Sequence, residues 1–190
     1  MIIEVHPLSR ERAGDFYRLH GPENGAGWCY CAAWRVPTWE GWGERTAEQN
    51  RALRQSLFDS GEYDGYLLYA DGEPAAWCQA GPRDNLTKLV AQYKLEPDPQ
   101  CRAITCLFTA PRFRTTGLTT ELVRQALAHL KESGVKMVQA FPRCGPSLPP
   151  EDLWTGPEQL FLSLGFRRIK EHSQWPVLQI DFEQTAVNVR

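Results

Sequence analysis

The spacing of apolar and polar positions along the N-terminal half predicts alternating strands and helices. An apolar run at residues 2–5 predicts a short strand, and apolar residues at helical spacing predict a helix over residues 9–20. Residues 21–43 are rich in Gly and Trp and show no regular period. A second helix is expected over residues 46–61, because Thr46 is followed three positions later by Gln49 in the pattern of a capping box.

The remaining pattern predicts a hairpin, an irregular segment and then an alternation of strands and helices. Two extended runs flank an Asp-Gly turn and predict a hairpin at residues 66–69 and 75–78. Residues 81–100 are polar and contain three prolines, so we expect a mobile excursion without regular structure. After it the pattern predicts a strand at 102–109, a helix at 117–133, a strand at 136–141, a short helix opening at Pro157, and strands at 166–169 and 177–182. This order favours a single α/β domain over residues 1–190, with a partly parallel sheet.

Composition limits the classes of function. The 190 residues carry a net charge of -2, which argues against a protein held to nucleic acid mainly by charge. No apolar stretch approaches the roughly 18 residues that span a bilayer. Residues 2–5 follow Met1 without the basic flank of a signal peptide, so we expect a cytoplasmic protein.

Two groups of residues are candidates for binding chemistry. Cys29 and Cys31 form a C-x-C pair, which predicts either small buried thiols or, as a remote alternative, a zinc or thiol module; no metal is expected. Tryptophan is concentrated in residues 28–42, which indicates either core packing or an aromatic wall for a ligand. The candidate substrate-binding residues are Trp28, Tyr30 and Trp34.

The segment at residues 107–119 combines a strand end, a basic loop and a helix start. The first N–H groups of a helix lack internal partners and attract anions. Gly117 allows close approach to the backbone there, while Arg112 and Arg114 supply positive charge. This pattern predicts a pyrophosphate cradle, although a plain turn with solvated arginines would have the same spacing.

The motif Arg114-x-x-Gly117-x-Thr119 resembles the (Gln/Arg)-x-x-Gly-x-(Gly/Ala) signature of the GNAT superfamily of acyl-CoA N-acyltransferases. Residues 160–166, ending in Gly-Phe, resemble the helix end that precedes the last strands of that family. The resemblance implies a mixed sheet of about six to seven strands with splayed central parallel strands and about four flanking helices. It also implies acetyl-CoA as co-substrate, held by residues 101–182 and in particular by Leu107, Phe108, Thr109, Arg112, Arg114, Thr115, Thr116, Gly117, Leu118 and Thr119.

Several positions depart from the family pattern. Phe161 stands where many members have a tyrosine that protonates the leaving thiolate, and Thr105 stands where some carry a glutamate base. Thr119 replaces a smaller residue. The catalytic groups therefore stay unassigned; candidate bases in predicted loops are Glu23, His20 and Asp84, and candidate acids are Tyr30 and Cys144.

The leading hypothesis is an acetyl-CoA-dependent N-acetyltransferase that acts on a small-molecule amine by direct attack in a ternary complex. Segments 8–60 and 81–100 are expected to form the acceptor side. The alternative is a catalytically degenerate acyl-CoA-binding sensor or interaction protein. The aromatic content is also compatible with a homodimer.

Overall fold

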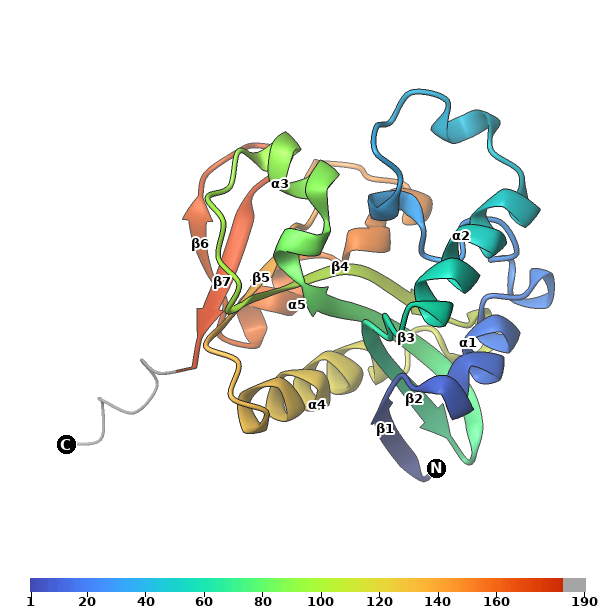
Figure 1. The fold of residues 1–190 in the computed structure, drawn as a ribbon. Coiled ribbons are helices and arrows are strands. Elements are labelled where there is room, and N and C mark those ends of the chain that lie inside the picture. The colour runs from blue at the N-terminus through green and yellow to red at the C-terminus, as the bar shows by residue number, and fades with distance from the viewer. Residues whose placement is uncertain (183–190) are drawn as a thin grey trace.

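A seven-stranded sheet, ordered β1-β2-β3-β4-β5-β7-β6, forms the centre of the computed structural model, which describes residues 1–182 (Figure 1). Neighbouring strands are antiparallel except β4 and β5, which are parallel. The strands are β1 (Ile3–Pro7), β2 (Gly65–Ala70), β3 (Glu73–Pro82), β4 (Cys101–Thr109), β5 (Met137–Ala140), β6 (Arg167–Lys170) and β7 (Val177–Asp181).

Helices cover both faces of the sheet, so alternate residues of the central strands enter different cores. The α-helices are α1 (Ala13–Leu19), α2 (Ala47–Asp59), α3 (Thr87–Tyr93), α4 (Leu118–Glu132) and α5 (Glu158–Ser163). Figure 1 shows α4 on one face and α1, α2 and α3 on the other. Leu68 and Ala76 pack in the core with α4, whereas Leu67 and Trp77 pack in the core with α1 and α2. This alternation follows from the two-residue period of a strand.

The two parallel strands at the centre stay paired over part of their length. β4 and β5 pair from Cys101 with Met137 to Ile104 with Ala140, where β5 ends. β4 continues for residues 105–109, with β3 paired on one edge. Within the described residues no strand pairs with the other edge of this segment. The splayed geometry that the resemblance implied is therefore present in the sheet.

The local signals in the sequence correspond to ordered features. Thr46 and Gln49 make the reciprocal capping box, with the Thr46 hydroxyl accepting from the Gln49 amide at 3.2 Å and the Gln49 side chain accepting from the Thr46 amide at 2.9 Å. Asp71 and Gly72 both adopt positive φ, of 51° and 81°, as the tight turn between β2 and β3 requires.

The prediction of an irregular excursion at residues 81–100 was wrong. β3 extends to Pro82, a 3-10 turn follows, and α3 occupies Thr87–Tyr93. Leu89 and Tyr93 anchor α3 in a third core cluster. The Tyr93 ring packs edge-on against Phe141, with 4.9 Å between the ring centroids. Tertiary packing stabilises this short helix more than its own sequence does. Residues 1–182 form five α-helices, where the resemblance implied about four.

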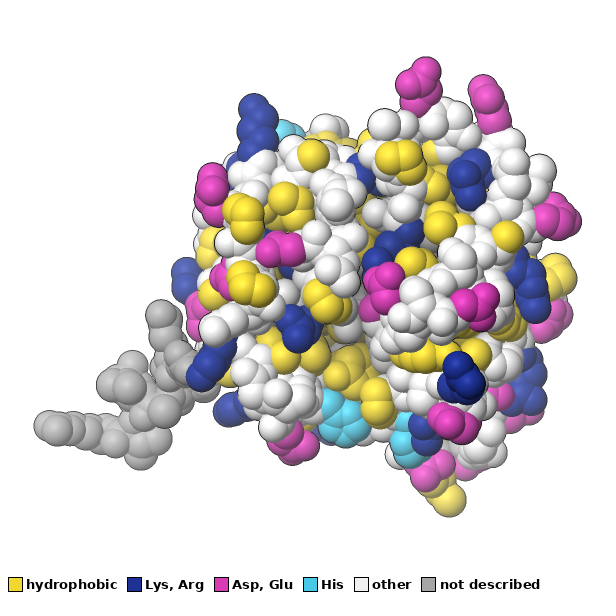
Figure 2. All heavy atoms as spheres, viewed as in Figure 1, with side chains coloured by type: hydrophobic (Ala, Val, Ile, Leu, Met, Phe, Trp, Pro, Cys, Tyr) yellow, Lys and Arg dark blue, Asp and Glu magenta, His cyan; other side chains and the backbone are white. Residues whose placement is uncertain are grey.

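No helix among residues 1–182 has the length and apolar character needed to cross a membrane. Acidic and basic side chains are interspersed over the face shown in Figure 2.

Candidate active site

A cleft of about 1010 Å³ opens where β4 separates from β5. One side is formed by residues 106–109 of β4 together with Arg114 and Thr119, and the opposite side by the Trp-rich segment after α1. Leu153, Trp154, Gly156 and Pro157 also line the cleft. The cleft therefore joins the predicted anion loop to the predicted acceptor segment, two regions that are far apart in the sequence.

The loop that begins α4 is exposed and open to a ligand. Gly117 is the N-cap residue of α4 at φ 81°, and Thr115 is also left-handed at φ 64°. The hydroxyls of Thr109 and Thr119 lie 2.8 Å apart and tie the end of β4 to the first turn of α4. Arg114 donates from Nε to the Thr109 carbonyl at 3.2 Å. The positive end of the α4 dipole is thus held beside the cleft.

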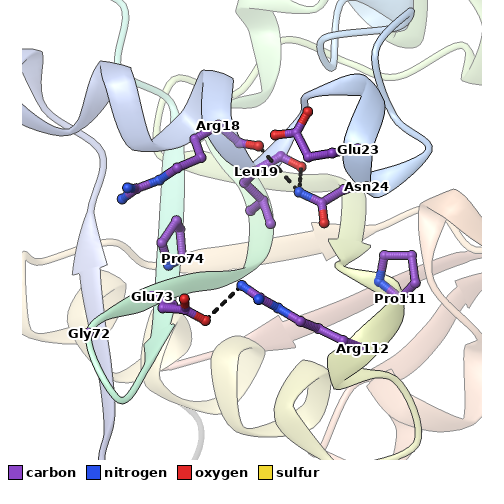
Figure 3. Close-up of a pocket in the computed structure, with 9 residues that line it drawn as sticks. All are labelled: Arg18, Leu19, Glu23, Asn24, Gly72, Glu73, Pro74, Pro111 and Arg112. Atoms are coloured by element: carbon purple, nitrogen blue, oxygen red, sulfur yellow. Dashed lines mark hydrogen bonds and ion pairs between the residues drawn. The ribbon is translucent and has the colours of Figure 1, made fainter.

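The two arginines of the loop have different surroundings. Arg114 lines the cleft, whereas Arg112 lines a separate pocket of about 480 Å³. Figure 3 shows Arg112 directed toward Glu73 of the β2–β3 hairpin, with which it forms an ion pair at 2.7 Å. Both members of this pair are more than half exposed, so the pair contributes little stability. Arg114 is the better-placed countercharge for a ligand in the cleft.

A buried polar network holds part of the segment that the sequence predicted to form the acceptor side. Asp64 forms ion pairs with Arg35 and Arg54 and accepts a hydrogen bond from the Gln79 amide at 2.9 Å. Burial opposes ionisation of Asp64, but the two guanidinium groups outweigh it and lower the pKa of this carboxyl. Arg54 donates to the backbone carbonyls of Tyr30 and Cys31 at 3.1 and 2.5 Å.

These bonds hold an unusual backbone segment. Tyr30 and Cys31 both have positive φ, 45° and 54°, which is costly for residues with a side chain. The Cys31 thiol donates to the side-chain oxygen Oε1 of Gln79 at 3.0 Å and accepts from the Trp77 indole N–H at 3.2 Å. Burial raises the pKa of the Cys31 thiol, but its contacts with Cys106, Arg54 and Trp77 lower the pKa overall. The network thereby fixes the chain that follows Trp28 and Cys29 along the cleft.

His20 also lines the cleft, with its ring stacked on Phe16 at 4.1 Å between centroids. Its Nδ1 lies 3.0 Å from the Phe16 carbonyl, so Nδ1 carries the proton, because a carbonyl only accepts. The buried Nε2 has no hydrogen-bond partner among the described residues. Burial lowers the pKa of His20 to about 3, so the imidazole is neutral at physiological pH.

The three predicted acceptor residues occupy different positions. Trp28 lines the cleft and is 38% exposed. Tyr30 is buried in the core beside α1 and does not line the cleft. Trp34 lines a neighbouring recess together with Tyr93 and Trp154. Burial of Tyr30 follows from its left-handed backbone, which turns the chain inward where Arg54 binds its carbonyl.

The other candidate catalytic residues are dispersed. Thr105 is fully buried and donates to Gln79 at 3.1 Å, and Phe161 is fully buried against Phe166. Cys144 lies outside the cleft, and burial together with Glu158 raises the pKa of its thiol to about 11.

Of the three candidate bases, His20 alone lines the cleft. Glu23 lines the pocket of Figure 3, and Asp84 accepts from Arg83 at 2.8 Å. Sequence reasoning placed all three in loops. The position of His20 directly after the Phe16 and Leu19 stripe of α1 was the signal that it faces the core.

Sequence reasoning missed further residues that line the cleft, among them Cys106, Trp154 and Pro157. Cys106 lies on the strand one position before the predicted binding segment, which is the signal that could have identified it. Among residues 1–182 no group of three or more His, Cys, Asp or Glu side chains is arranged to hold a metal ion.

The splayed sheet and the loop at α4 define an α/β protein with an exposed helix N-terminus beside an open cleft. A family model described as "Acetyltransferase (GNAT) family" matches residues 28–145. The chain therefore belongs to the acetyltransferase (GNAT) family, whose members transfer acyl groups from acyl-CoA to amines.

Solved structures agree on the fold. The chain is similar to the aminoglycoside acetyltransferase AAC(6')-Ib in complex with coenzyme A, at 16% identity and a TM-score of 0.62, covering 98% of this chain and 100% of that chain. It is also similar to the PaiA N-acetyltransferase of Thermoplasma acidophilum in complex with coenzyme A, at 12% identity and a TM-score of 0.56, covering 96% and 100%. The ribosomal-protein-S18-alanine N-acetyltransferase of Escherichia coli matches at 12% identity and a TM-score of 0.54, covering 100% and 99%. No curated protein sequence matches the chain.

Proposed function

We propose that this protein transfers the acetyl group of acetyl-CoA to the primary amine of a small molecule by direct attack in a ternary complex. The observation that carries the proposal is the single cleft that joins the exposed loop at α4 to the aromatic segment around Trp28. One cleft with two differently built ends suits two substrates held side by side, and alignment of this kind can supply roughly 7–11 kcal/mol of the barrier. The crystallised aminoglycoside acetyltransferase gives a precedent for a small-molecule acceptor on this fold.

The acyl-CoA end of the proposal uses residues 107–119. At residues 107–109 one edge of β4 pairs with no strand among residues 1–182, and this edge presents backbone groups to the amides of the pantetheine arm. The pyrophosphate lies against the N-terminus of α4, with Gly117 allowing close approach and Arg114 supplying countercharge. Of the other predicted loop residues, Thr119 lines the cleft and Arg112 lines the separate pocket, whereas Thr115, Thr116 and Leu118 line neither.

The amine must be neutral when it attacks, and an alkylammonium has a pKa of roughly 10 in water. His20 is the proposed acceptor for an N–H of the amine, because its Nε2 carries a lone pair with no partner among the described residues. With its pKa held near 3, this imidazole orients the neutral amine and does not store a proton in the resting enzyme. The ammonium proton is lost to water before attack. After attack, the C–S bond breaks and one proton of the attacking nitrogen passes through water to the sulfur of CoA, which leaves as the thiol.

A thermal-shift titration with acetyl-CoA, CoA and dephospho-CoA tests the proposal. A ligand that binds the folded state alone raises stability by about 2.7 kcal/mol at one hundred times its Kd. The Arg114→Glu variant is expected to lose this shift. Arg112→Glu is the matched comparison on the same loop, and a smaller loss is expected because Arg112 pairs with Glu73 outside the cleft.

Turnover is then measured as CoA release with a panel of primary amines. Acetyl-CoA binding without release of CoA to any amine would favour the alternative of an acyl-CoA-binding sensor. Absence of both binding and turnover would contradict the proposal at its first step.

A further inference from the structure

A recess of about 420 Å³ adjoins the cleft and is walled mainly by aromatic rings. We call it the aromatic recess; its rings belong to Trp34, Trp39, Tyr93, Trp154 and Trp175. Trp39 and Trp154 line both the recess and the cleft, so the two spaces share a boundary. These rings come from segments before α2, at the end of α3, before α5 and between β6 and β7. Convergence of four distant segments makes this a built pocket.

One of the rings that line the aromatic recess, that of Trp34, has an unsatisfied hydrogen-bond donor. The Nε1 of Trp34 is buried and has no partner among the described residues. The Nε1 of Trp39 donates to the Gln92 side-chain oxygen at 2.7 Å. Buried indole N–H groups normally find an acceptor, so the unpaired donor of Trp34 points to an acceptor atom supplied by a ligand.

The charges around the aromatic recess select against a second cation. Lys88 Nζ lies 3.2 Å from the centroid of the Trp39 ring and 5.5 Å from that of Trp34. Arg143 lies 5.1 Å from the Trp175 ring and pairs with Asp152 at 2.6 Å. Three of the five rings, those of Trp34, Trp39 and Trp175, therefore already face a cation of the protein itself. A flat, uncharged aromatic group is the guest that these walls favour.

We propose that the aromatic recess binds the aryl group of an arylalkylamine acceptor and that an oxygen on this ring accepts the N–H of Trp34. The alkyl chain passes the boundary formed by Trp39 and Trp154, and the amine then lies in the cleft. This inference rests on the proposed function, because it names the acceptor class of the same active site.

Three amines separate the contributions of the ring and of its oxygen. 4-Methoxyphenethylamine has both, 4-ethylphenethylamine has the ring without the oxygen, and n-hexylamine has neither. Binding of each to the CoA-saturated protein is measured by calorimetry, and acetylation by CoA release. We expect the methoxy compound to bind about tenfold more tightly than the ethyl compound, the effect of one hydrogen bond to a previously unpaired donor. Both aryl amines are expected to bind at least about tenfold more tightly than hexylamine.

Two matched variants test whether the preference for the methoxy compound comes from the N–H of Trp34. Trp34→Phe keeps a ring and removes the unpaired N–H, so the preference for methoxy over ethyl is expected to fall to about one. Trp39→Phe removes an N–H that already has a partner in Gln92, so this preference is expected to persist even where the affinity for both compounds changes.

Equal affinity for the three amines in the calorimeter would overturn the recess assignment, whether or not acetylation occurs. An unchanged methoxy preference in Trp34→Phe would overturn the role of its N–H. If the protein binds acetyl-CoA and acetylates hexylamine as well as the aryl amines, the proposed function stands and this inference fails. If the protein binds no acetyl-CoA, the proposed function fails on its own test.

Discussion

Lys88 lies over Trp39, with Nζ 3.2 Å from the centroid of the indole ring, and donates a hydrogen bond to the Ala33 carbonyl. Trp34 and Trp42 lie within 5.8 Å of the same nitrogen. The tryptophans that the sequence suggested as a pocket for a cationic ligand therefore surround a cation of the protein itself. This contact joins α3 to the Trp-rich segment and so connects both acceptor-side segments that the sequence predicted.

Removal of Lys88 is expected to change how stability depends on pH. Burial lowers the pKa of Lys88 to about 8. In the unfolded chain the pKa is about 10.4. Between these values the unfolded chain binds a proton that the folded protein does not, so this group makes the free energy of unfolding rise with pH from about 8 to 10.4. The Lys88→Met variant is expected to lack this part of the rise in the free energy of unfolding, which is measured by urea unfolding at a series of pH values.

Lys131→Met is the control, because Lys131 is exposed near the end of α4. The thiols and phenols that titrate in the same pH range are present in the unmodified protein and in both variants, so they do not affect the comparison. A pH dependence in Lys88→Met equal to that of Lys131→Met would contradict the assignment of the lowered pKa to Lys88.

His20 is expected to stay neutral across the physiological range. Burial lowers the pKa of His20 from 6.5 to about 3. NMR of its ring should therefore show no titration between pH 5 and 8, with the proton on Nδ1. Between about 6.5 and 3 the unfolded chain binds a proton that the folded protein excludes, so the free energy of unfolding falls as the pH is lowered. His20→Phe should lack this component, and an imidazole titrating near 6.5 would contradict the burial of the ring.

The part of the site that could be predicted from sequence is the part built from consecutive residues. The strand, loop and helix at residues 107–119 position Gly117 and Arg114 through local backbone geometry, and a local pattern specifies them. The tight turn at Asp71 and the cap at Thr46 are local in the same sense.

The acceptor side could not be predicted in this way, because contacts between distant segments build it. Tyr30 is buried because Arg54 binds its carbonyl, and Arg54 is held in turn by Asp64. The sequence separations between these residues follow no pattern from which the contacts could have been predicted. α3 was missed for the same reason, since Tyr93 packs on Phe141, which follows β5 and is far away in the sequence.

The network around Asp64 is expected to be essential for stability. Asp64→Asn removes the charge that faces Arg35 and Arg54, both buried, and leaves two guanidinium groups without their carboxylate. Breaking a buried ion pair in this way typically costs about 3–5 kcal/mol. Urea unfolding measures the loss. Asp59→Asn, at an exposed position at the end of α2, is the control and should change stability by less than about 0.5 kcal/mol. Similar losses in the two variants would show that the network contributes no more than a surface contact.

The two ends of α4 offer a test that separates strain from binding. Gly117 precedes the helix at φ 81° and Gly134 follows it at φ 83°. A Cβ built at either position meets no atom within 4 Å. Substitution by alanine should therefore cost about the same at both ends, roughly 1–2 kcal/mol for an L-residue in the left-handed region.

Gly117→Ala should in addition weaken acetyl-CoA binding about tenfold, because its Cβ lies beside the helix N-terminus where the pyrophosphate is proposed to bind. Gly134→Ala, at the far end of the same helix, should bind acetyl-CoA as the unmodified protein does. Urea unfolding gives the first comparison and calorimetric titration with acetyl-CoA gives the second. Equal affinity in the two variants would place the pyrophosphate away from this loop, even though the fold and the family stay as they are.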